Sequence, residues 1–167
     1  MAIILVGGGA RSGKSRYALQ IARRYGQRLI FLATAQAFDQ EMETRIAQHR
    51  NERGAEFTTV EEPIDLGCAI REAAGDAIVV DCLTLWLSNV MLAFGRDVNA
   101  DIESVVDAVQ ASQTAVILVT NEVGSGIVPD NELGRDYRDR CGALNQRVAS
   151  VADEVYWMVF GCPVRVK

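Results

Sequence analysis

A three-layer α/β fold, with a mostly parallel sheet between two layers of helices and a small β ribbon at the C-terminal end, is the fold class that this sequence predicts. Two observations support it. Short apolar runs alternate along the chain with segments whose apolar residues recur at helical spacing, which is typical of repeated β-α units. The runs are continuous rather than alternating, as in parallel strands that helices cover on both faces.

The predicted elements follow in order. The strands share a short apolar core bounded by glycine or polar residues, and they lie at residues 3–6, 29–33, 57–60 (a weak signal), 77–80, 115–119 and 155–160, with a last short strand after the turn at 161–163. The helices share an apolar stripe, and they are expected from the glycines at 7–9 to Gly26, from Asp39 past His49, over 63–75, over 84–94, around 102–109 and from Asp130 to Val151. This β/α alternation predicts one sheet rather than separate units.

Length and composition limit the possible classes of protein. The chain has 167 residues, of which 49% are apolar, so a single domain over residues 1–167 is expected. A net charge of -5 argues against a nucleic-acid partner, because binding to nucleic-acid phosphates depends on Lys and Arg. The four cysteines form no CxxC pair, and no apolar run is long enough for a membrane span, so we expect reduced thiols in a cytoplasmic protein.

The segment after the first predicted strand carries the clearest motif. Gly8-Gly9-Ala10-Arg11-Ser12-Gly13-Lys14-Ser15 fits the P-loop pattern G-x-x-x-x-G-K-[ST], and it lies between a predicted strand and a predicted helix as the mechanism requires. Backbone amides of such a loop bind phosphates, Lys14 reaches the outer phosphates, and the Ser15 hydroxyl binds Mg²⁺. The alternative is a glycine-rich turn without a ligand.

Asp81 ends the apolar run at 77–80, which is the form of a Walker B strand. A carboxylate at this place holds Mg²⁺ or its water shell. It can equally cap the following helix, beside Thr84, and the two roles are compatible.

His49 is the only histidine in the chain, and Arg45, Arg50 and Arg53 lie near it in sequence. A neutral imidazole is a competent nucleophile near pH 7, and guanidinium groups would neutralise a phosphate that it attacks. Taken alone, a helical histidine is more often a solvated or packed side chain. The glycine-rich segment 120–129 follows a buried strand, so it is expected at the edge of the sheet where ligands bind, although it could be only a loop.

Taken together, these residues resemble one family, the bifunctional adenosylcobinamide kinase / adenosylcobinamide-phosphate guanylyltransferase. The resemblance runs nearly end to end and rests on Gly8–Ser15, Ala33-Thr34-Ala35, Arg45-Ile46-x-x-His49, Val119–Gly124 with Gly126–Pro129, and Leu144-Asn145-Gln146-Arg147. It implies a RecA-like P-loop NTPase fold and a homotrimer.

The resemblance also implies the chemistry. His49 would attack the α-phosphate of GTP, release pyrophosphate and pass GMP to adenosylcobinamide phosphate, after a kinase step in which ATP or GTP phosphorylates adenosylcobinamide. Mg²⁺ would be held by Ser15 and Asp81, where the family pattern has Glu in place of Asp81. The P-loop motif and the resemblance together give the expected nucleotide contacts: Gly8, Gly9, Ala10, Arg11, Ser12, Gly13, Lys14, Ser15, Ala33, Thr34, Ala35, Arg50, Asn51, Glu52, Arg53, Glu61 and Asp81.

Two other functions compete with this interpretation. A simple P-loop small-molecule kinase would need Lys14, Ser15 and Asp81 but no nucleophilic histidine. A non-enzymatic nucleotide switch would need segments ordered by the γ-phosphate and a protein partner. Formation of a covalent GMP adduct separates the first from the bifunctional enzyme, and turnover without any partner protein excludes the second.

Overall fold

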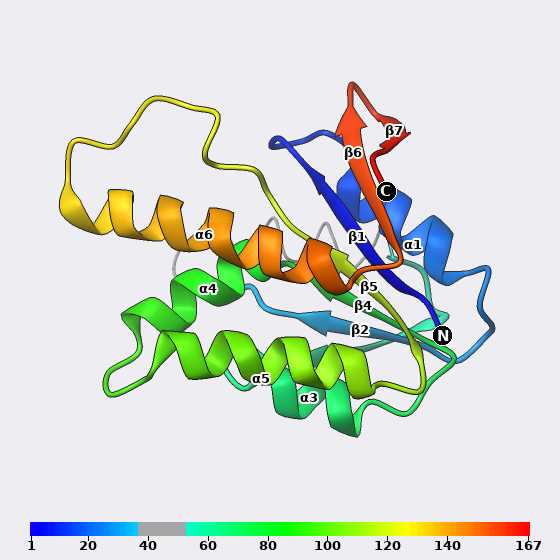
Figure 1. Ribbon diagram of the computed structural model, residues 1–167. Coiled ribbons are helices and arrows are strands. Elements are labelled where there is room, and N and C mark those ends of the chain that lie inside the picture. Colours follow the sequence, from blue (N-terminus) through cyan, green and yellow to red (C-terminus); the bar gives the residue numbers. More distant parts are fainter. Residues whose placement is uncertain (37–52) are drawn as a thin grey trace.

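The computed structural model describes residues 1–36 and 53–167, and within them seven strands form one sheet (Figure 1). The strands are β1 Ile3–Gly8, β2 Leu29–Ala33, β3 Phe57–Glu61, β4 Ala77–Asp81, β5 Ala115–Val119, β6 Glu154–Val159 and β7 Cys162–Arg165. The helices in this part of the chain are α1 Lys14–Ala22, α3 Leu66–Glu72, α4 Leu83–Leu92, α5 Val98–Ala111 and α6 Glu132–Val151. The predicted helix that begins near Asp39 lies outside the described residues.

The sheet has the order β3-β2-β4-β5-β1-β6-β7. Every neighbouring pair is parallel except β6 with β7, which is antiparallel. The mostly parallel sheet and the C-terminal ribbon are therefore confirmed, and β6 joins that ribbon to the main sheet through β1. Strand β5 lies between β1 and β4, so the P-loop strand and the strand that ends at Asp81 are not adjacent.

Helices cover both faces of the sheet, which explains the continuous apolar runs. Successive residues of β4 point to opposite sides: Ile78 and Val80 pack in the core beneath α3, α4, α5 and α6, whereas Ala77 and Val79 pack beneath α1. Figure 1 shows α6 across one face with α4 and α5 beside it, and α1 on the other side of the sheet. Both faces of a parallel strand are buried in this arrangement, so no polar face is left to give a period of two.

Several helix ends differ from their predictions: α3 is shorter than the predicted 63–75, α5 is longer than the predicted 102–109, and α1 and α4 end early. Helix α1 ends at Ala22, and the stripe residue Tyr25 lies in a turn after it. The predicted helix over 84–94 was expected to be largely buried, but α4 ends at Leu92 and Phe94 is fully exposed, so the prediction is wrong for its last turn. The chain turns away there, since Gly95 has a φ of 77°, and α5 begins soon after with the Asp97 carboxylate accepting hydrogen bonds from Asn99 and Ala100.

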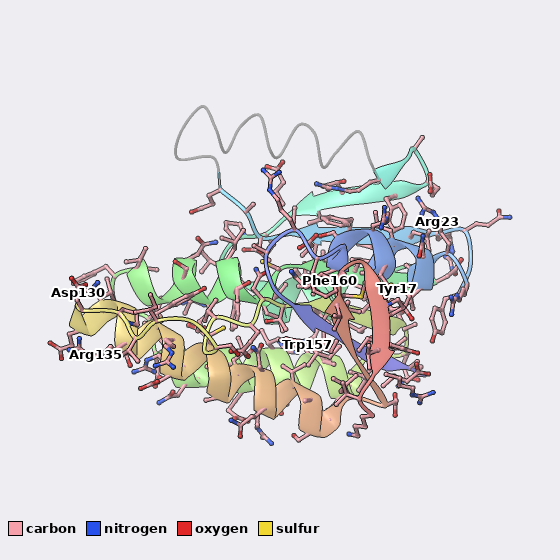
Figure 2. The ribbon with its side chains drawn as sticks, turned by 90° about the horizontal axis from the view of Figure 1, so that it is seen from above. Tyr17, Arg23, Asp130, Arg135, Trp157 and Phe160 are labelled. Atoms are coloured by element: carbon pink, nitrogen blue, oxygen red, sulfur yellow. The ribbon has the colours of Figure 1, made fainter. Side chains whose placement is uncertain are left out.

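The β6–β7 ribbon is tied to α1 by an aromatic pair. The rings of Tyr17 and Tyr156 meet edge to face with their centres 5.2 Å apart. Figure 2 shows Tyr17, Trp157 and Phe160 together on one side of the molecule, far from Asp130 and Arg135 at the other end.

None of the described helices is both long and apolar enough to cross a membrane.

Candidate nucleotide site

The P-loop closes the gap between β1 and α1 through backbone conformations that favour glycine. Gly8 has a φ of 146° and Gly13 a φ of 91°, and Arg11 between them has a φ of 54°. A side chain at Gly8 would place its Cβ 3.0 Å from both the carbonyl oxygen of Met158 and the Ser12 Oγ. The glycines of the motif are therefore needed for the shape of the loop as well as for access by a phosphate.

Lys14 is the first residue of α1 and is only 7% exposed. Its ammonium group donates to the carbonyl oxygen of Gly9 at 2.5 Å and to Ser12 Oγ at 3.4 Å, so it lies across the loop. Burial lowers the pKa of Lys14, and the charge of Asp81 raises it in part. The lysine is thus a desolvated positive charge beside a carboxylate, which is the charge distribution expected where phosphate and a divalent cation bind together.

The carboxyl ends of the strands form one row. The register pairs Val6 with Val119, Val119 with Asp81, Asp81 with Ala33, and Ala33 with Glu61. The P-loop begins directly after β1 reaches this row. The predicted nucleotide contacts at the ends of β2, β3 and β4 therefore lie on the same side of the sheet as the P-loop. With neighbouring strands about 4.8 Å apart, the row from β1 to β3 spans about 19 Å.

Asp81 is half-buried at the end of β4, and the residue after it is held by a threonine. Thr34 Oγ1 donates to the carbonyl oxygen of Cys82 and accepts from the Cys82 N–H, each at 2.8 Å. The Thr34 hydroxyl therefore makes both of its hydrogen bonds within the protein, and the side chain is fully buried. Thr34 stabilises the backbone next to Asp81. Helix α4 begins at Leu83 with Cys82 as its N-cap residue, and no side-chain capping bond is present there.

Glu61 and Arg53 lie at the other end of the row. Glu61 ends β3 and is exposed at the edge of the sheet. Arg53 is 5% exposed, its guanidinium carbon lies 3.7 Å from the centre of the Phe31 ring, and its Nη1 donates to Thr59 Oγ1. Because Phe31 and Thr59 are paired in the middle of β2 and β3, the Arg53 guanidinium packs over the strands rather than beside the P-loop. His49, Arg50, Asn51 and Glu52 lie outside the described residues.

The loop between β5 and α6 meets the P-loop at the same edge, and a helix far along the chain holds it. Asn145 of α6 accepts from Thr120 Oγ1 at 2.6 Å and donates to the carbonyl oxygen of Asn121 at 3.3 Å. Asn121 donates in turn to Thr84 Oγ1 at 2.9 Å. The sequence analysis predicted that this segment lies where ligands bind but assigned no role to these residues. The run of polar residues directly after a fully buried strand was the sequence feature that could have indicated one.

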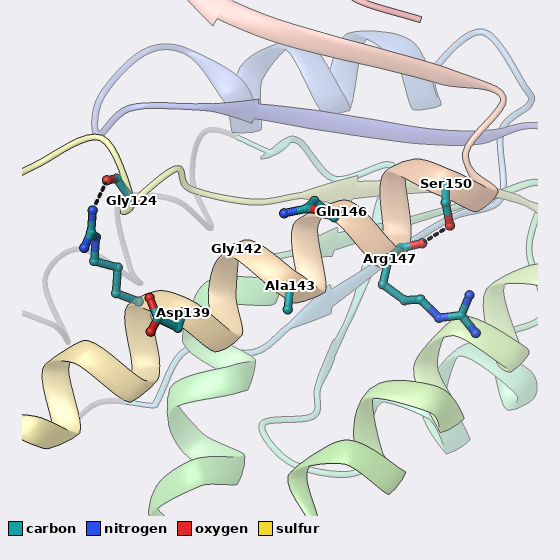
Figure 3. Close-up of a pocket in the computed structure, with 8 residues that line it drawn as sticks. Gly124, Asp139, Gly142, Ala143, Gln146, Arg147 and Ser150 are labelled. Carbon is teal, nitrogen blue, oxygen red and sulfur yellow. Dashed lines mark hydrogen bonds between the residues drawn. The ribbon is translucent and has the colours of Figure 1, made fainter.

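A cavity of about 680 Å³ opens beside this loop, along α6. Its lining residues are Gly124, Arg138, Asp139, Gly142, Ala143, Gln146, Arg147 and Ser150, and none of them belongs to the P-loop. Figure 3 shows a hydrogen bond at one end of it, in which Arg138 Nη2 donates to the carbonyl oxygen of Gly124 at 2.6 Å. The cavity therefore adjoins the β5–α6 loop and is separate from the phosphate loop.

The parallel sheet, the glycine loop and the buried lysine define a P-loop nucleotide-binding protein. Residues 4–166 match the family model described as cobinamide kinase / cobinamide phosphate guanyltransferase. The chain belongs to this family.

Curated relatives match over almost the whole chain. It is 42% identical to the bifunctional adenosylcobalamin biosynthesis protein CobP of Pseudomonas aeruginosa, over 98% of this chain and 96% of that protein. It is 39% identical to the protein CobU of Salmonella typhimurium, which has the same description, over 99% of both chains.

Solved structures with low sequence identity share the fold. The flagellar accessory protein FlaH of Methanocaldococcus jannaschii has a TM-score of 0.56 at 11% identity, and the match covers 99% of this chain and 78% of that one. The RadB recombinase has a TM-score of 0.51 at 16% identity, with 93% and 73% covered. An ATPase from the type III secretion system of pathogenic bacteria has a TM-score of 0.55 at 14% identity, with 95% and 51% covered. These likenesses support the predicted P-loop, RecA-like α/β fold.

Proposed function

We propose that this chain catalyses both reactions of its family: phosphorylation of adenosylcobinamide with ATP or GTP, and transfer of GMP from GTP to the adenosylcobinamide phosphate so formed. The observation that carries the proposal is an intact P-loop, with Lys14 buried across it, in a chain that matches the bifunctional relatives from end to end. The products would be adenosylcobinamide-GDP and pyrophosphate.

Nucleotide phosphates would bind at the P-loop. In a P-loop the N–H groups of the loop and of the first turn of the following helix bind phosphate oxygens, and the dipole of α1 favours an anion at its N-terminus. Lys14 would exchange its bond to the Gly9 carbonyl for one to an outer phosphate oxygen. Because the ammonium group is already desolvated and held near its working position, little reorganisation is needed on binding.

Mg²⁺ suits the residues at this edge. Ser15 is the second residue of α1, Asp81 ends β4, both are half-buried, and the Asp81 charge already acts on Lys14. In residues 1–36 and 53–167 no group of three or more His, Cys, Asp or Glu side chains is arranged around a metal position. Mg²⁺ commonly takes only one or two protein ligands and completes its shell with substrate phosphates and water, so Ser15 and Asp81 fit it. Bound there, it would neutralise charge on the phosphates.

The rest of the nucleotide would extend along the row of strand ends. Ala33 lies in the row between Asp81 and Glu61, and the half-buried Ala35 follows it two residues later with a small side chain that leaves room for a ligand beside it. This arrangement supports nucleotide contacts at β2 and β3 in addition to the phosphate contacts at β1.

GMP transfer would go through His49. Its imidazole nitrogen would form a bond to the α-phosphorus of GTP as the bond to the bridging oxygen breaks, and pyrophosphate would leave with that electron pair. A phosphate oxygen of adenosylcobinamide phosphate would then displace the imidazole. The phosphorus–nitrogen bond is weakened by protonation of the leaving imidazole, which makes histidine suitable for a transferred group.

Intact mass after incubation with GTP and Mg²⁺, without corrinoid, tests the transfer step. The wild type should gain one GMP through a bond that is labile in acid and stable in base. His49→Ala should lose the adduct and GMP transfer but keep kinase activity, while the neighbouring change Gln48→Ala serves as the matched control. A wild type that binds GTP and never forms the adduct would leave only the kinase reaction.

We further propose that the protein assembles as a homotrimer. Exposed apolar side chains on the β6–β7 ribbon support contact between copies: Trp157 is 38% exposed, Phe160 98% and Val164 50%. Light scattering should give three times the 18.2 kDa mass of one chain, and Phe160→Asp should reduce it. A monomer at micromolar concentration contradicts this proposal without affecting the catalytic one.

A further inference from the structure

The β5–α6 loop places the backbone of a glutamate against the P-loop, and the site described above has no use for its carboxylate. Glu122 follows β5, the strand directly beside β1. Its backbone N–H donates to the carbonyl oxygen of Gly8 at 3.2 Å, so Glu122 is attached to the start of the P-loop. With a strand spacing of about 4.8 Å, Glu122 lies about one spacing from β1, whereas Asp81 lies two spacings away and Glu61 four.

The chain on both sides of Glu122 is fixed. Before it, Asn121 is bonded to Thr84 and Asn145. After it, the Gly124 N–H donates to Glu122 Oε1 at 2.5 Å, and the Gly124 carbonyl accepts from Arg138 of α6. The carboxylate is half-buried and held within the loop, which is the preorganisation that a reacting group requires.

The two proposed reactions differ in their need for a base. Phosphorylation begins with a hydroxyl group, which must lose its proton as its oxygen bonds to phosphorus. The acceptor of GMP is a phosphate oxygen that is already ionised at neutral pH, and neutral imidazole needs no base to attack. A carboxylate on the loop that contacts the P-loop would therefore serve the first reaction alone.

We propose that Glu122 is the general base of the phosphorylation step, an inference that rests on the proposed function. Its carboxylate takes the proton of the acceptor hydroxyl while that oxygen bonds to the γ-phosphorus. The bond from the γ-phosphorus to the bridging oxygen breaks, and the nucleoside diphosphate leaves with the electron pair. Glu122 then returns its proton to solvent. Asp81 is less suited, since its charge acts on Lys14 and its place fits Mg²⁺.

Glu122→Gln tests this role while keeping the loop bond, because the amide oxygen of glutamine can still accept from the Gly124 N–H. The rate of phosphorylation should fall about 10²- to 10³-fold. The Kd for nucleotide, formation of the GMP adduct, and GMP transfer to acceptor that has already been phosphorylated should stay within twofold of wild type. Glu132→Gln, an exposed glutamate in the first turn of α6, is the matched control.

A second variant, Gly124→Ala, moves the carboxylate without removing it. A Cβ at Gly124 would lie 2.6 Å from Glu122 Oε1, the flexible end of that side chain, so the carboxylate must turn away. Phosphorylation should fall about 10- to 10²-fold and adduct formation should persist.

Three outcomes separate the ideas. Wild-type phosphorylation by Glu122→Gln overturns the role of Glu122 as base. Equal losses of nucleotide binding, adduct and phosphorylation in that variant mean that Glu122 only supports the loop, and they overturn it too. A wild type that performs neither reaction overturns the proposed function itself.

Discussion

Two loops meet at the active edge of the sheet, and they are built in opposite ways. The loop after β1 takes its shape from its own backbone, with Gly8 and Gly13 at positive φ and Lys14 bonded back to Gly9. The loop after β5 takes its shape from side chains, and most of its support comes from Asn145 and Arg138 on α6. The first loop is therefore contained in a short stretch of sequence, whereas the second depends on α6 residues 14 to 25 positions away and on Thr84, 37 positions away.

We expect the largest loss of activity from a change in the first loop. Lys14→Ala removes the buried charge from the phosphates, so both reactions should fall about 10²- to 10³-fold. The chain has one other lysine, Lys167, whose Nζ donates to Ala149 and Ser150 carbonyls, and Lys167→Ala is the control. Steady-state rates of both half-reactions measure the change, and unchanged rates would remove the P-loop from the mechanism.

A smaller effect is expected at Asp81, between the two loops. Asp81→Asn should raise the Mg²⁺ concentration needed for half-maximal activity by about tenfold or more, with little change in Tm. It should also lower the pKa of Lys14 further, because the Asp81 charge now offsets part of the effect of burial. A lysine charge that favours phosphate binding is lost as pH rises through its pKa, so nucleotide affinity in the variant should decline at lower pH than in wild type.

Magnesium titrations at several pH values measure both effects, with the exposed Asp107→Asn as control. A large fall in Tm with an unchanged magnesium requirement would instead assign Asp81 a structural role at the start of α4.

Breaking the second loop should cost stability before activity. Asn145→Ala removes the α6 amide from Thr120 Oγ1 and leaves the Asn121 carbonyl with only the weak Cys141 thiol donor on α6, so the free energy of unfolding should fall by about 1–3 kcal/mol. Denaturant unfolding measures it. The neighbouring change Gln146→Ala, at an exposed position on α6, should have little effect, and equal losses in the two variants would mean that the network does not support the loop.

The smallest effect concerns the thiols beneath the two loops. Burial raises the pKa of Cys82 and of Cys141 from 9.0 to about 11. Below pH 9 their contribution to folding is complete, and it is lost as pH rises toward 11, because the unfolded chain releases these protons first. Unfolding free energies at pH 8, 9, 10 and 11 should decline less steeply for Cys141→Ser than for wild type.

Alkylation at pH 8 gives a direct check on the same thiols. The exposed Cys68 and Cys162 should react, and Cys82 and Cys141 should not. Rapid reaction of all four in the folded protein would contradict the burial. In Asn145→Ala, faster labelling of Cys141, whose Sγ lies 3.8 Å from the Asn121 carbonyl oxygen, would show that the second loop has loosened.

Features that depend on local sequence could be predicted, and features that depend on distant residues could not. Strands β2, β4 and β5 begin at the predicted residues, Leu29, Ala77 and Ala115. A strand that is buried on both faces is a continuous apolar run with polar or glycine neighbours, so its first residue can be recognised in the sequence. The P-loop was predictable since its function depends on local backbone shape. The exposed Phe94 was not, because an apolar residue carries no local sign of the side to which a turn directs it.

The β5–α6 loop shows where such reasoning ends. Its place at the edge of the sheet followed from the strand before it, but the pairing of Thr120 with Asn145 depends on how α6 lies across the sheet. Arg53 gives the same lesson, as its stacking on Phe31 required the register of β2 and β3. The roles proposed for His49 and for the Mg²⁺ ligands stay predictions that the experiments above address.

The order of the strands has a consequence for synthesis of the chain. The P-loop strand leaves the ribosome well before its two neighbours, β5 and β6, which pair with it from more than a hundred residues later in the chain. Until they arrive, both edges of β1 lack partners and the glycine loop has no rigid base. Contacts so distant in sequence form slowly. A nascent chain should therefore acquire affinity for nucleotide only after β5 and β6 have been synthesised, and a bound nucleotide would then favour the completed fold over any partly folded form.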